Sequence, residues 1–477
     1  MIFNSFQFIW LFPLIFIVYW AVSHFKSDRV AKIPQYFLLL VSYGVYFQWT
    51  PAYCLILLYV TAITYFGGKL LYKRRNKSKT IRYRAICWIS VFLALGPLLV
   101  FKYYSFIMAA GASVLANIGI DTAPPGLNWV VPLGLSFYTF QALGYMWDVY
   151  YGKITPERSF GNYMLFVAFF PQILCGPISR ASDLLPQIAH PKKFEYDRAV
   201  SGMRLLLWGL FLKVVLADRI GIYVDAVYNY YNNFSGSTCL LSSILYSFQI
   251  YGDFAGYSYM AVGVARLLGF ELIYNFNRPY FATSVSGFWK RWNISLTRWL
   301  TSYIYIPLGG NRKGKIRTYV NIFITFLVSG IWHGANYTFI LWGAIHGAVQ
   351  CIEKSLGLNK APRNKWWTFP RMLLTFVIVT FAWIFFRMPK IKDAITMIGM
   401  FFTDFGELFF DPEPLFFIAI AFIILLPVEI LLEYRNARFK SFVLTHPLIR
   451  WCGYLLLSAV ILTCGVLNSS QFIYVNF

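Results

Sequence analysis

The sequence predicts an all-α integral membrane protein, and both its composition and its pattern of apolar runs support this prediction. Of the 477 residues, 58% are hydrophobic and only 13% are charged, whereas a soluble domain carries roughly 45–50% apolar and about 25% charged residues. The apolar runs are continuous and do not alternate with a period of two, which favours helices over a transmembrane barrel. Many Trp and Tyr residues lie near the ends of these runs, where their rings suit the headgroup region.

Apolar runs long enough to cross a bilayer, ~20 residues each, follow one another along the chain. They lie at about 4–24, 35–48 paired with 52–70, 86–110, 128–151, 202–222, 240–268, 370–387, 415–433 and 449–467. Two further stretches are expected to be irregular. One is 160–178, which Pro171, Gly176 and Pro177 interrupt, and the other is 319–353, which we expect to break between Gly330 and Asn336. The sequence therefore predicts about eleven transmembrane helices together with re-entrant or in-plane helices.

The net charge of +23 comes from short basic loops between apolar runs. These basic residues are Lys73, Arg74, Arg75, Lys77, Lys79, Arg82 and Arg84, then Arg312, Lys313, Lys315 and Arg317, and then Arg435, Arg438 and Lys440. Such a distribution is typical of cytoplasmic loops, so we do not expect a nucleic-acid partner. The predicted topology places every strongly basic loop inside. The N-terminus, the acidic stretch 404–413 and the C-terminus then lie outside.

Several familiar catalytic patterns are missing from the sequence. There is no G-x-S-x-G, no G-x-x-x-x-G-K-[ST] and no H-E-x-x-H, which argues against a serine hydrolase, a nucleotide-driven pump and a zinc protease. The seven cysteines are scattered without metal-ligand spacing, and we expect no metal site. His190 and Glu195 lie in a polar loop, and their resemblance to a soluble acyltransferase pattern is attributed to chance.

Two of the five histidines, His333 and His346, lie within the apolar stretch 319–353. Ionisable residues at membrane depth are rare and mark candidate functional sites. His333 is flanked by Gly330 and Gly334 in the segment SGIWHGAN, where glycines let backbone or substrate approach the imidazole closely. The alternative is a structural histidine bonded to a carbonyl group. This alternative weighs more for His346 than for His333.

Two other clusters place polar groups among apolar ones. Trp289, Trp292 and Trp299, with their neighbouring Lys and Arg residues, predict a cationic-aromatic helix over 288–299 at a membrane face or an entry funnel. If this helix has only a structural role, that role is to anchor the protein at the membrane interface. In the second cluster, Gln249 and Asp253 lie inside an apolar span. An isolated carboxylate in lipid is unfavourable, so Asp253 is expected to pair with a cation or a hydroxyl, or to stay protonated.

Several long motifs in a fixed order resemble the membrane-bound O-acyltransferase (MBOAT) family, and its alginate O-acetylation branch most closely. They are VPLGLSFYTFQALGYMWDVY (131–150), FVAFFPQILCGPISR (166–180), QIYGDFAGYSYMAVGVARLLGF (249–270), NFNRPY (275–280), FWKRWNISLTRWLTSYIYIPLGG (288–310) and SGIWHGANYTFILWGAIHG (329–347). The resemblance implies one membrane domain over 1–477, with a catalytic core at about 128–353. It also implies helices that form a funnel and a central tunnel.

The resemblance also implies roles for particular residues. His333 falls on the family's essential histidine, and Asn293 falls on a second polar position that is more often His in this branch. Asn293 therefore departs from the branch, which questions an acid or base role but leaves hydrogen bonding. Tyr259 stands where the family has an aspartate. If the role of that aspartate is needed in this protein, Asp253 would fill it. The expected substrate-binding residues are Asp253, Gln249, Trp289, Arg291, Trp332 and Asn336.

The function expected from this resemblance is O-acetylation of an exported or cell-surface polysaccharide. The donor would be a cytoplasmic thioester, either acetyl-CoA or an acyl carrier protein, with no bound cofactor, and an extracytoplasmic SGNH-type acetyltransferase is the expected partner. His333 would act as general base, since imidazole titrates near neutral pH, and Asn293 would orient the acyl carbonyl. Two alternatives stay open, D-alanyl transfer to teichoic acid and a non-enzymatic lipid or sugar transporter.

Overall fold

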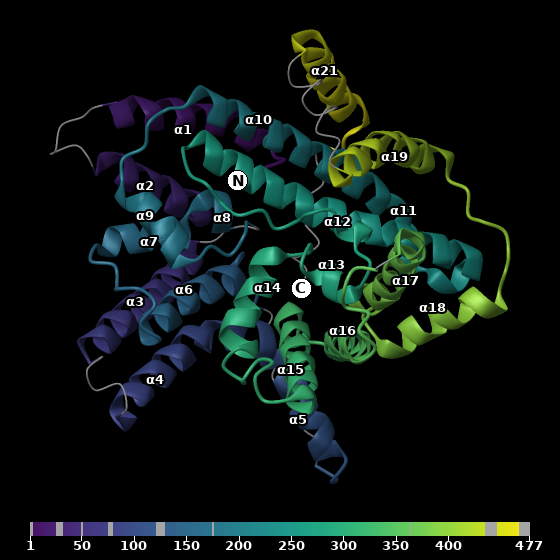
Figure 1. The fold of residues 1–477 in the computed structure, drawn as a ribbon, viewed down its shortest axis with the longest axis horizontal. Helices are drawn as coiled ribbons and strands as arrows, with labels where there is room; N and C mark the ends of the chain where they lie inside the picture. Colours follow the sequence, from purple (N-terminus) through teal and green to yellow (C-terminus); the bar gives the residue numbers. More distant parts are fainter. Residues whose placement is uncertain are drawn as a thin grey trace. The chain divides into compact units, whose positions relative to one another are not determined.

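The computed structural model describes residues 3–24, 32–48, 51–74, 80–120, 129–173, 176–362, 364–434 and 446–466. Within these ranges the chain forms helices joined by turns and loops, and no β-strand is present (Figure 1). Contacts between Cα atoms divide the chain into two compact units. Unit 1 comprises residues 1–203 and 261–273, and unit 2 comprises 204–260 and 274–477.

Unit 1 is built mainly from the N-terminal helices. These are α1 (Phe6–His24), α2 (Ile33–Phe47), α3 (Pro51–Lys73), α4 (Ile81–Leu98), the π-helix η2 (Leu99–Tyr103), α5 (Tyr104–Ala116), α6 (Leu135–Tyr150), α7 (Phe160–Ala168), α8 (Phe170–Ile173), α9 (Ala181–Ala189) and the start of α10 (Tyr196–Leu210). Helices α3, α4 and α6 pack against one another and lie side by side in Figure 1. Tyr163 of α7 is fully buried among these helices, where its hydroxyl donates to Thr64 Oγ1 at 2.8 Å.

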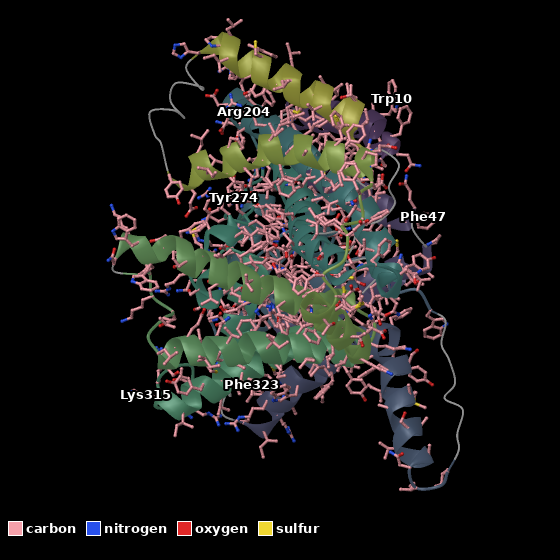
Figure 2. The ribbon with its side chains drawn as sticks, turned by 90° about the vertical axis from the view of Figure 1, so that its right-hand side faces the viewer. Trp10, Phe47, Arg204, Tyr274, Lys315 and Phe323 are labelled. Atoms are coloured by element: carbon pink, nitrogen blue, oxygen red, sulfur yellow. The ribbon has the colours of Figure 1, made fainter. Side chains whose placement is uncertain are left out.

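Unit 2 carries most of the C-terminal half. Its helices are η3 (Phe211–Ala217), α11 (Asp218–Asn229), η4 (Tyr231–Asn233), most of α12 (Gly236–Leu267), η5 (Pro279–Phe281), α13 (Val285–Trp289), α14 (Ile294–Leu300), η6 (Thr301–Tyr305), α15 (Lys315–His333), α16 (Tyr337–Ser355), η7 (Lys365–Trp367), α17 (Thr368–Arg387), α18 (Ile391–Thr403), α19 (Pro412–Glu433) and α21 (Pro447–Cys464). Figure 2 shows side chains filling the space between these helices, with Lys315 at the start of α15 and Phe323 two turns further on.

The apolar runs predicted from the sequence are largely helical where the structure describes them, although residues 129–134 and 465–466 at the ends of two runs are not. Six of the described helical segments are long and apolar enough to cross a membrane. They are Phe6–His24, Pro51–Lys73, Ile81–Ala116, Lys365–Arg387, Pro412–Glu433 and Pro447–Cys464. The all-helical membrane fold is thus confirmed, and the number of about eleven spans stays a prediction. Parts of two basic loops, 75–79 and 435–440, lie outside the described residues.

The interrupted stretch 160–178 is helical in pieces, and its backbone is held by Gln141 of α6. The helix bends at Phe169 between α7 and α8. Gln141 donates to the Phe166 carbonyl oxygen at 2.5 Å, and its own carbonyl oxygen accepts from the side chain of Gln172 and from the backbone of Ser179. Irregular backbone at membrane depth needs such partners inside the protein. Residues 174 and 175 of this stretch lie outside the described residues.

The predicted cationic-aromatic helix over 288–299 is wrong in one respect, because the structure divides it. Helix α13 ends at Trp289, and α14 begins after Asn293, whose φ of 42° is left-handed and cannot continue a right-handed helix. The Trp289, Trp292 and Trp299 side chains are buried and do not lie on an exposed face. The aromatic residues of this segment therefore contribute to the interior.

Candidate functional site

His333 is the last residue of α15 and is almost completely buried, with 3% of its surface exposed. The helix ends there because Gly334 is extended, and Asn336 then caps the next helix by accepting the Thr338 N–H at 3.1 Å. The predicted break between Gly330 and Asn336 therefore lies at 334–336, and Gly330 itself is helical. Irregular backbone at membrane depth is tolerated only where it is buried in protein or lines a cavity, so this break marks a candidate site.

The two helices on either side of this break approach each other at glycines. A Cβ added to Gly330 would lie 2.3 Å from the Phe339 carbonyl oxygen, and one added to Gly343 would lie 2.4 Å from that of Phe326. Small residues at such crossings let backbones of membrane helices pack closely. The glycines of this hairpin thus bring His333 of α15 against the side chains of α16.

Aromatic rings surround His333. Its ring centroid lies 4.8 Å from that of Trp332, 4.9 Å from Trp342 and 5.3 Å from Phe386 of α17. Trp342 stacks on Trp383, and the ring centroids of Trp383 and Trp292 lie 5.1 Å apart. We call these rings the aromatic cluster (Trp292, Trp332, Trp342, Trp383 and Phe386). The cluster links His333 to the residue just before Asn293.

Asn293 is fully buried and has a left-handed backbone. The residues that follow it are hydrogen-bonded to Asn275. The Ile294 N–H donates to the Asn275 carbonyl oxygen at 2.9 Å, and the Ser295 N–H donates to the Asn275 side chain at 3.0 Å. The Asn293 amide itself has no hydrogen-bond partner among the described residues. A buried amide that is left unbonded in a strained segment is typical of a ligand-binding position.

Arg291 is engaged within the protein. Its guanidinium forms two hydrogen bonds with Glu433 at the end of α19, at 2.8 and 2.9 Å, and Arg278 bonds the same carboxylate at 2.7 Å. Arg278 has a φ of 45°, so both non-glycine residues with left-handed backbone in the described chain, Arg278 and Asn293, lie in this segment. Glu433 therefore fastens the segment that carries Asn293.

Asp253 and Gln249 lie one turn apart on α12, and the expectation that Asp253 pairs with a cation is confirmed. Lys213 of η3 is completely buried, and its ammonium contacts Asp253 at 2.6 Å and Asp218 at 2.7 Å. The Gln249 amide points toward Gly221 of α11. The structure thus places Asp253 in an ionic cluster (Lys213, Asp218 and Asp253) and Gln249 next to α11.

The remaining predicted residues lie near His333. Trp332 is its neighbour in sequence and in ring contact. Trp289 reaches the aromatic cluster through Trp342, at 5.5 Å between ring centroids. Asn336, besides capping α16, donates to the Pro389 carbonyl oxygen at 2.8 Å. A direct role of any predicted residue in binding substrate stays a prediction.

Sequence reasoning missed several residues that shape this region. Lys213 carried a usable signal, because it is a lone cation inside the apolar run 202–222. Trp342 and Trp383 carried none, since an aromatic residue within an apolar helix is ordinary core. Glu433 lies at the end of an apolar run, where a charged residue usually marks only the boundary of the run. Among the described residues, no group of three or more His, Cys, Asp or Glu side chains could hold a metal ion.

The fold and this region define a multi-pass helical membrane protein with a histidine buried at a helix break. Comparison with known proteins identifies the class further. The family model of the membrane-bound O-acyltransferases matches residues 154–389. The chain is 34% identical to the probable alginate O-acetylase AlgI of Pseudomonas aeruginosa, over 84% of this chain and 75% of that protein. This protein belongs to the membrane-bound O-acyltransferase family, and it is an acyltransferase of the membrane.

Two other relatives differ in the group that they are named for transferring. The peptidoglycan O-acetyltransferase of Helicobacter pylori is 31% identical, over 83% of this chain and 79% of that protein. The teichoic acid D-alanyltransferase of Bacillus subtilis is 28% identical, over 55% of this chain and 70% of that protein. The similarity to the two O-acetyl-transferring relatives thus extends over more of the chain than the similarity to the D-alanyl-transferring one.

Proposed function

We propose that this protein transfers an acetyl group from a cytoplasmic thioester to an acceptor hydroxyl across the membrane, for O-acetylation of an exported or cell-surface polysaccharide, with His333 as general base. The observation that carries the proposal is the burial of His333 at the end of α15, against the aromatic cluster. The relatives that match most of the chain are named for O-acetylation of alginate and of peptidoglycan, which are both polymers with sugar hydroxyls. Membership of an acyltransferase family argues against the transporter alternative.

In the proposed reaction His333 takes the proton of the acceptor hydroxyl. The hydroxyl oxygen then forms a bond to the thioester carbonyl carbon, and the carbonyl oxygen carries the developing negative charge. The carbon–sulfur bond breaks as this intermediate collapses, and the proton returns from His333 to the leaving sulfur. The products are an acetyl ester and a free thiol. Water exclusion by the surrounding rings would limit hydrolysis of the thioester.

Asn293 is proposed to orient the acyl donor through its unbonded, buried amide. Trp289 and Trp332 are proposed to line the substrate site. The polar atoms of Arg291 and Asp253 form ion pairs within the protein, and those of Asn336 cap α16 and donate to the Pro389 carbonyl oxygen in the loop between α17 and α18. We assign these three, with Gln249, to holding the site in place, so that they act on substrate indirectly.

The donor is proposed to be acetyl-CoA or an acetylated acyl carrier protein. The location is proposed to be the cytoplasmic membrane, with the N-terminus outside. Basic loops such as 311–317 would face the donor on the inner side and attract its phosphates. The acetyl group would leave on the outer side, where an SGNH-type acetyltransferase partner would pass it to the polymer.

The test is thioester turnover by the purified protein, with acetyl-CoA or acetylated carrier protein as donor and a polysaccharide as acceptor, with and without an SGNH-type acetyltransferase partner. We expect His333→Ala to lower turnover by ~10²–10⁴-fold, the range for loss of a general acid–base group, while the protein stays monodisperse. His190→Ala is the matched control, because His190 is exposed and bonds only a nearby backbone carbonyl in the described contacts. Equal turnover of the His333 variant and the natural protein would sink the assignment of His333.

The same assay distinguishes transfer of an acetyl group from transfer of a D-alanyl group. A natural protein that releases thiol from the acetyl donor but not from D-alanyl carrier protein supports the proposed function. The opposite preference would assign the protein to D-alanyl transfer. No turnover with any donor and acceptor pair would contradict the proposed enzymatic function as a whole.

A further inference from the structure

His346 is a second imidazole in the same region, and the proposed reaction does not yet use it. It lies in the middle of α16 and is completely buried. Its ring centroid is 4.9 Å from Trp342, the same distance that separates Trp342 from His333. One indole, that of Trp342, therefore contacts both histidines, so the two imidazoles share a neighbour in the aromatic cluster.

The hydrogen bond from Trp289 fixes which nitrogen of His346 carries the proton. The indole Nε1 of Trp289 donates to Nδ1 of His346 at 3.3 Å. An indole N–H is only a donor, so Nδ1 must present its lone pair and the neutral ring carries its proton on Nε2. The Trp289 contact thus holds His346 as a donor at Nε2.

The Nε2–H group of His346 has no hydrogen-bond partner among the described residues. A donor left unsatisfied inside a protein is unfavourable by about 1–3 kcal/mol. Unbonded buried groups are rare in native structures and call for a specific explanation. A ligand with an acceptor oxygen, bound during the reaction cycle, would satisfy this donor.

A second contact keeps the Trp289–His346 bond in place. Glu353, two helical turns beyond His346 on α16, accepts the backbone N–H groups of Val285 and Ser286 at 2.5 and 2.9 Å. These N–H groups open helix α13, which ends at Trp289. Helix α16 therefore holds α13 at both ends. This double attachment positions the indole that orients His346.

We propose that His346 is a second catalytic residue, whose Nε2–H donates a hydrogen bond to the carbonyl oxygen of the acyl donor. This inference rests on the proposed function. Charge builds on that oxygen when the acceptor hydroxyl attacks, and a fixed donor in a dry site stabilises it. Since Nε2 already carries a proton and Nδ1 is occupied by Trp289, His346 is a donor and not a base. The proton transfer is left to His333.

Two amide substitutions test the two nitrogens separately. The side-chain oxygen of Asn can take the place of Nδ1, so His346→Asn keeps an acceptor for Trp289 and removes the donor at Nε2. The longer side chain of Gln can place an N–H near Nε2, so His346→Gln keeps the donor and loses the acceptor. The measurement is kcat and KM for thiol release, with thermal unfolding of each variant in detergent. His190→Asn is the matched control on an exposed histidine.

We expect His346→Asn to lower kcat by ~10²–10³-fold, the loss seen when one oxyanion donor is removed, with little change in KM. His346→Gln should recover at least tenfold of that loss. Trp289→Phe, which keeps a ring but removes the N–H, should lower kcat less than His346→Asn does, since the free imidazole can still adopt the donor tautomer.

Two results would overturn the role of His346 alone. One is natural turnover in His346→Asn. The other is an equal loss in the Asn and Gln variants that follows their loss of thermal stability, which would make His346 purely structural. Both are distinguishable from failure of the proposed function, because His333→Ala is measured alongside. Absence of turnover in the natural protein would overturn the function and the inference together.

Discussion

The ionic cluster of Lys213, Asp218 and Asp253 depends on a single ammonium group that contacts two carboxylates. All three side chains are almost completely buried, with at most 8% of any of them exposed. Removing one partner of a buried ion pair is strongly unfavourable, because the remaining charge stays desolvated. Since two negative groups face one positive group, the lysine matters more to this cluster than either aspartate does.

Replacement of the lysine should therefore be the most damaging single change here. We expect Lys213→Met to destabilise the protein by ~3–5 kcal/mol, and Asp253→Asn to destabilise it less, because the ammonium keeps Asp218. Thermal unfolding in detergent, followed by size-exclusion chromatography, measures the difference. Lys153→Met is the comparison, since Lys153 is half exposed and pairs at 3.2 Å with one buried carboxylate, that of Asp148, so its loss should destabilise the protein less than the loss of Lys213. Equal effects of Lys213→Met and Lys153→Met would contradict this account.

At the scale of elements, the hairpin of α15 and α16 brings both imidazoles to the aromatic cluster. Its helices approach closely at Gly330 and Gly343, where an added Cβ would meet a carbonyl oxygen of the facing helix. Any larger side chain there would move one helix against the other. Because His333 lies on α15 and His346 on α16, such a movement would change the distance between the imidazoles and thus the geometry of the site.

A single methyl group at this crossing tests that dependence. We expect Gly343→Ala to destabilise the protein by ~1–3 kcal/mol through overpacking and to lower turnover by ~10²-fold through misplacement of the reacting groups. Gly399→Ala is the matched control, because a Cβ at Gly399 in α18 meets nothing within 4 Å. That change should be neutral or stabilising by ~0.5–1 kcal/mol. Natural turnover in Gly343→Ala would show that the close crossing does not set the geometry of the site.

At the scale of the whole molecule, the distribution of charge predicts how the chain crosses the membrane. The described basic residues 312–317 precede and begin α15, whereas the acidic stretch 404–413 precedes and begins α19, so they belong to different segments of unit 2. Basic residues accumulate on the cytoplasmic side of membrane proteins, so the topology places 312–317 inside and 404–413 outside. The proposed cytoplasmic thioester donor and extracytoplasmic acceptor would require a protein that is open to both sides.

Cysteine labelling tests this topology. In a variant without the natural cysteines, Glu407→Cys should react with a membrane-impermeant maleimide on intact cells. Arg312→Cys should react only after the membrane is permeabilised. Both residues are exposed, so accessibility to the reagent does not favour either one. Labelling of Arg312→Cys on intact cells would reverse the predicted orientation.

The sequence by itself determined the class of fold and the position of the central histidine. Long apolar runs dictate helices in lipid because backbone hydrogen bonds must be satisfied within each segment. The small residues around His333 indicated the helix break, which the structure places at 334–336. The acidic residue Asp253 in an apolar run likewise called for a cation or hydroxyl partner, or for protonation. These inferences succeeded because each rests on chemistry local to one segment.

Only the tertiary structure decided which distant residues meet. The cation for Asp253 is Lys213, from another helix, and Arg291 pairs with Glu433 from near the other end of the chain. The tautomer of His346 is set by Trp289, and the ring that contacts both imidazoles is Trp342. Periodicity and composition describe the faces of single helices and carry no information about which helix packs against them. These contacts arise from packing between segments far apart in sequence.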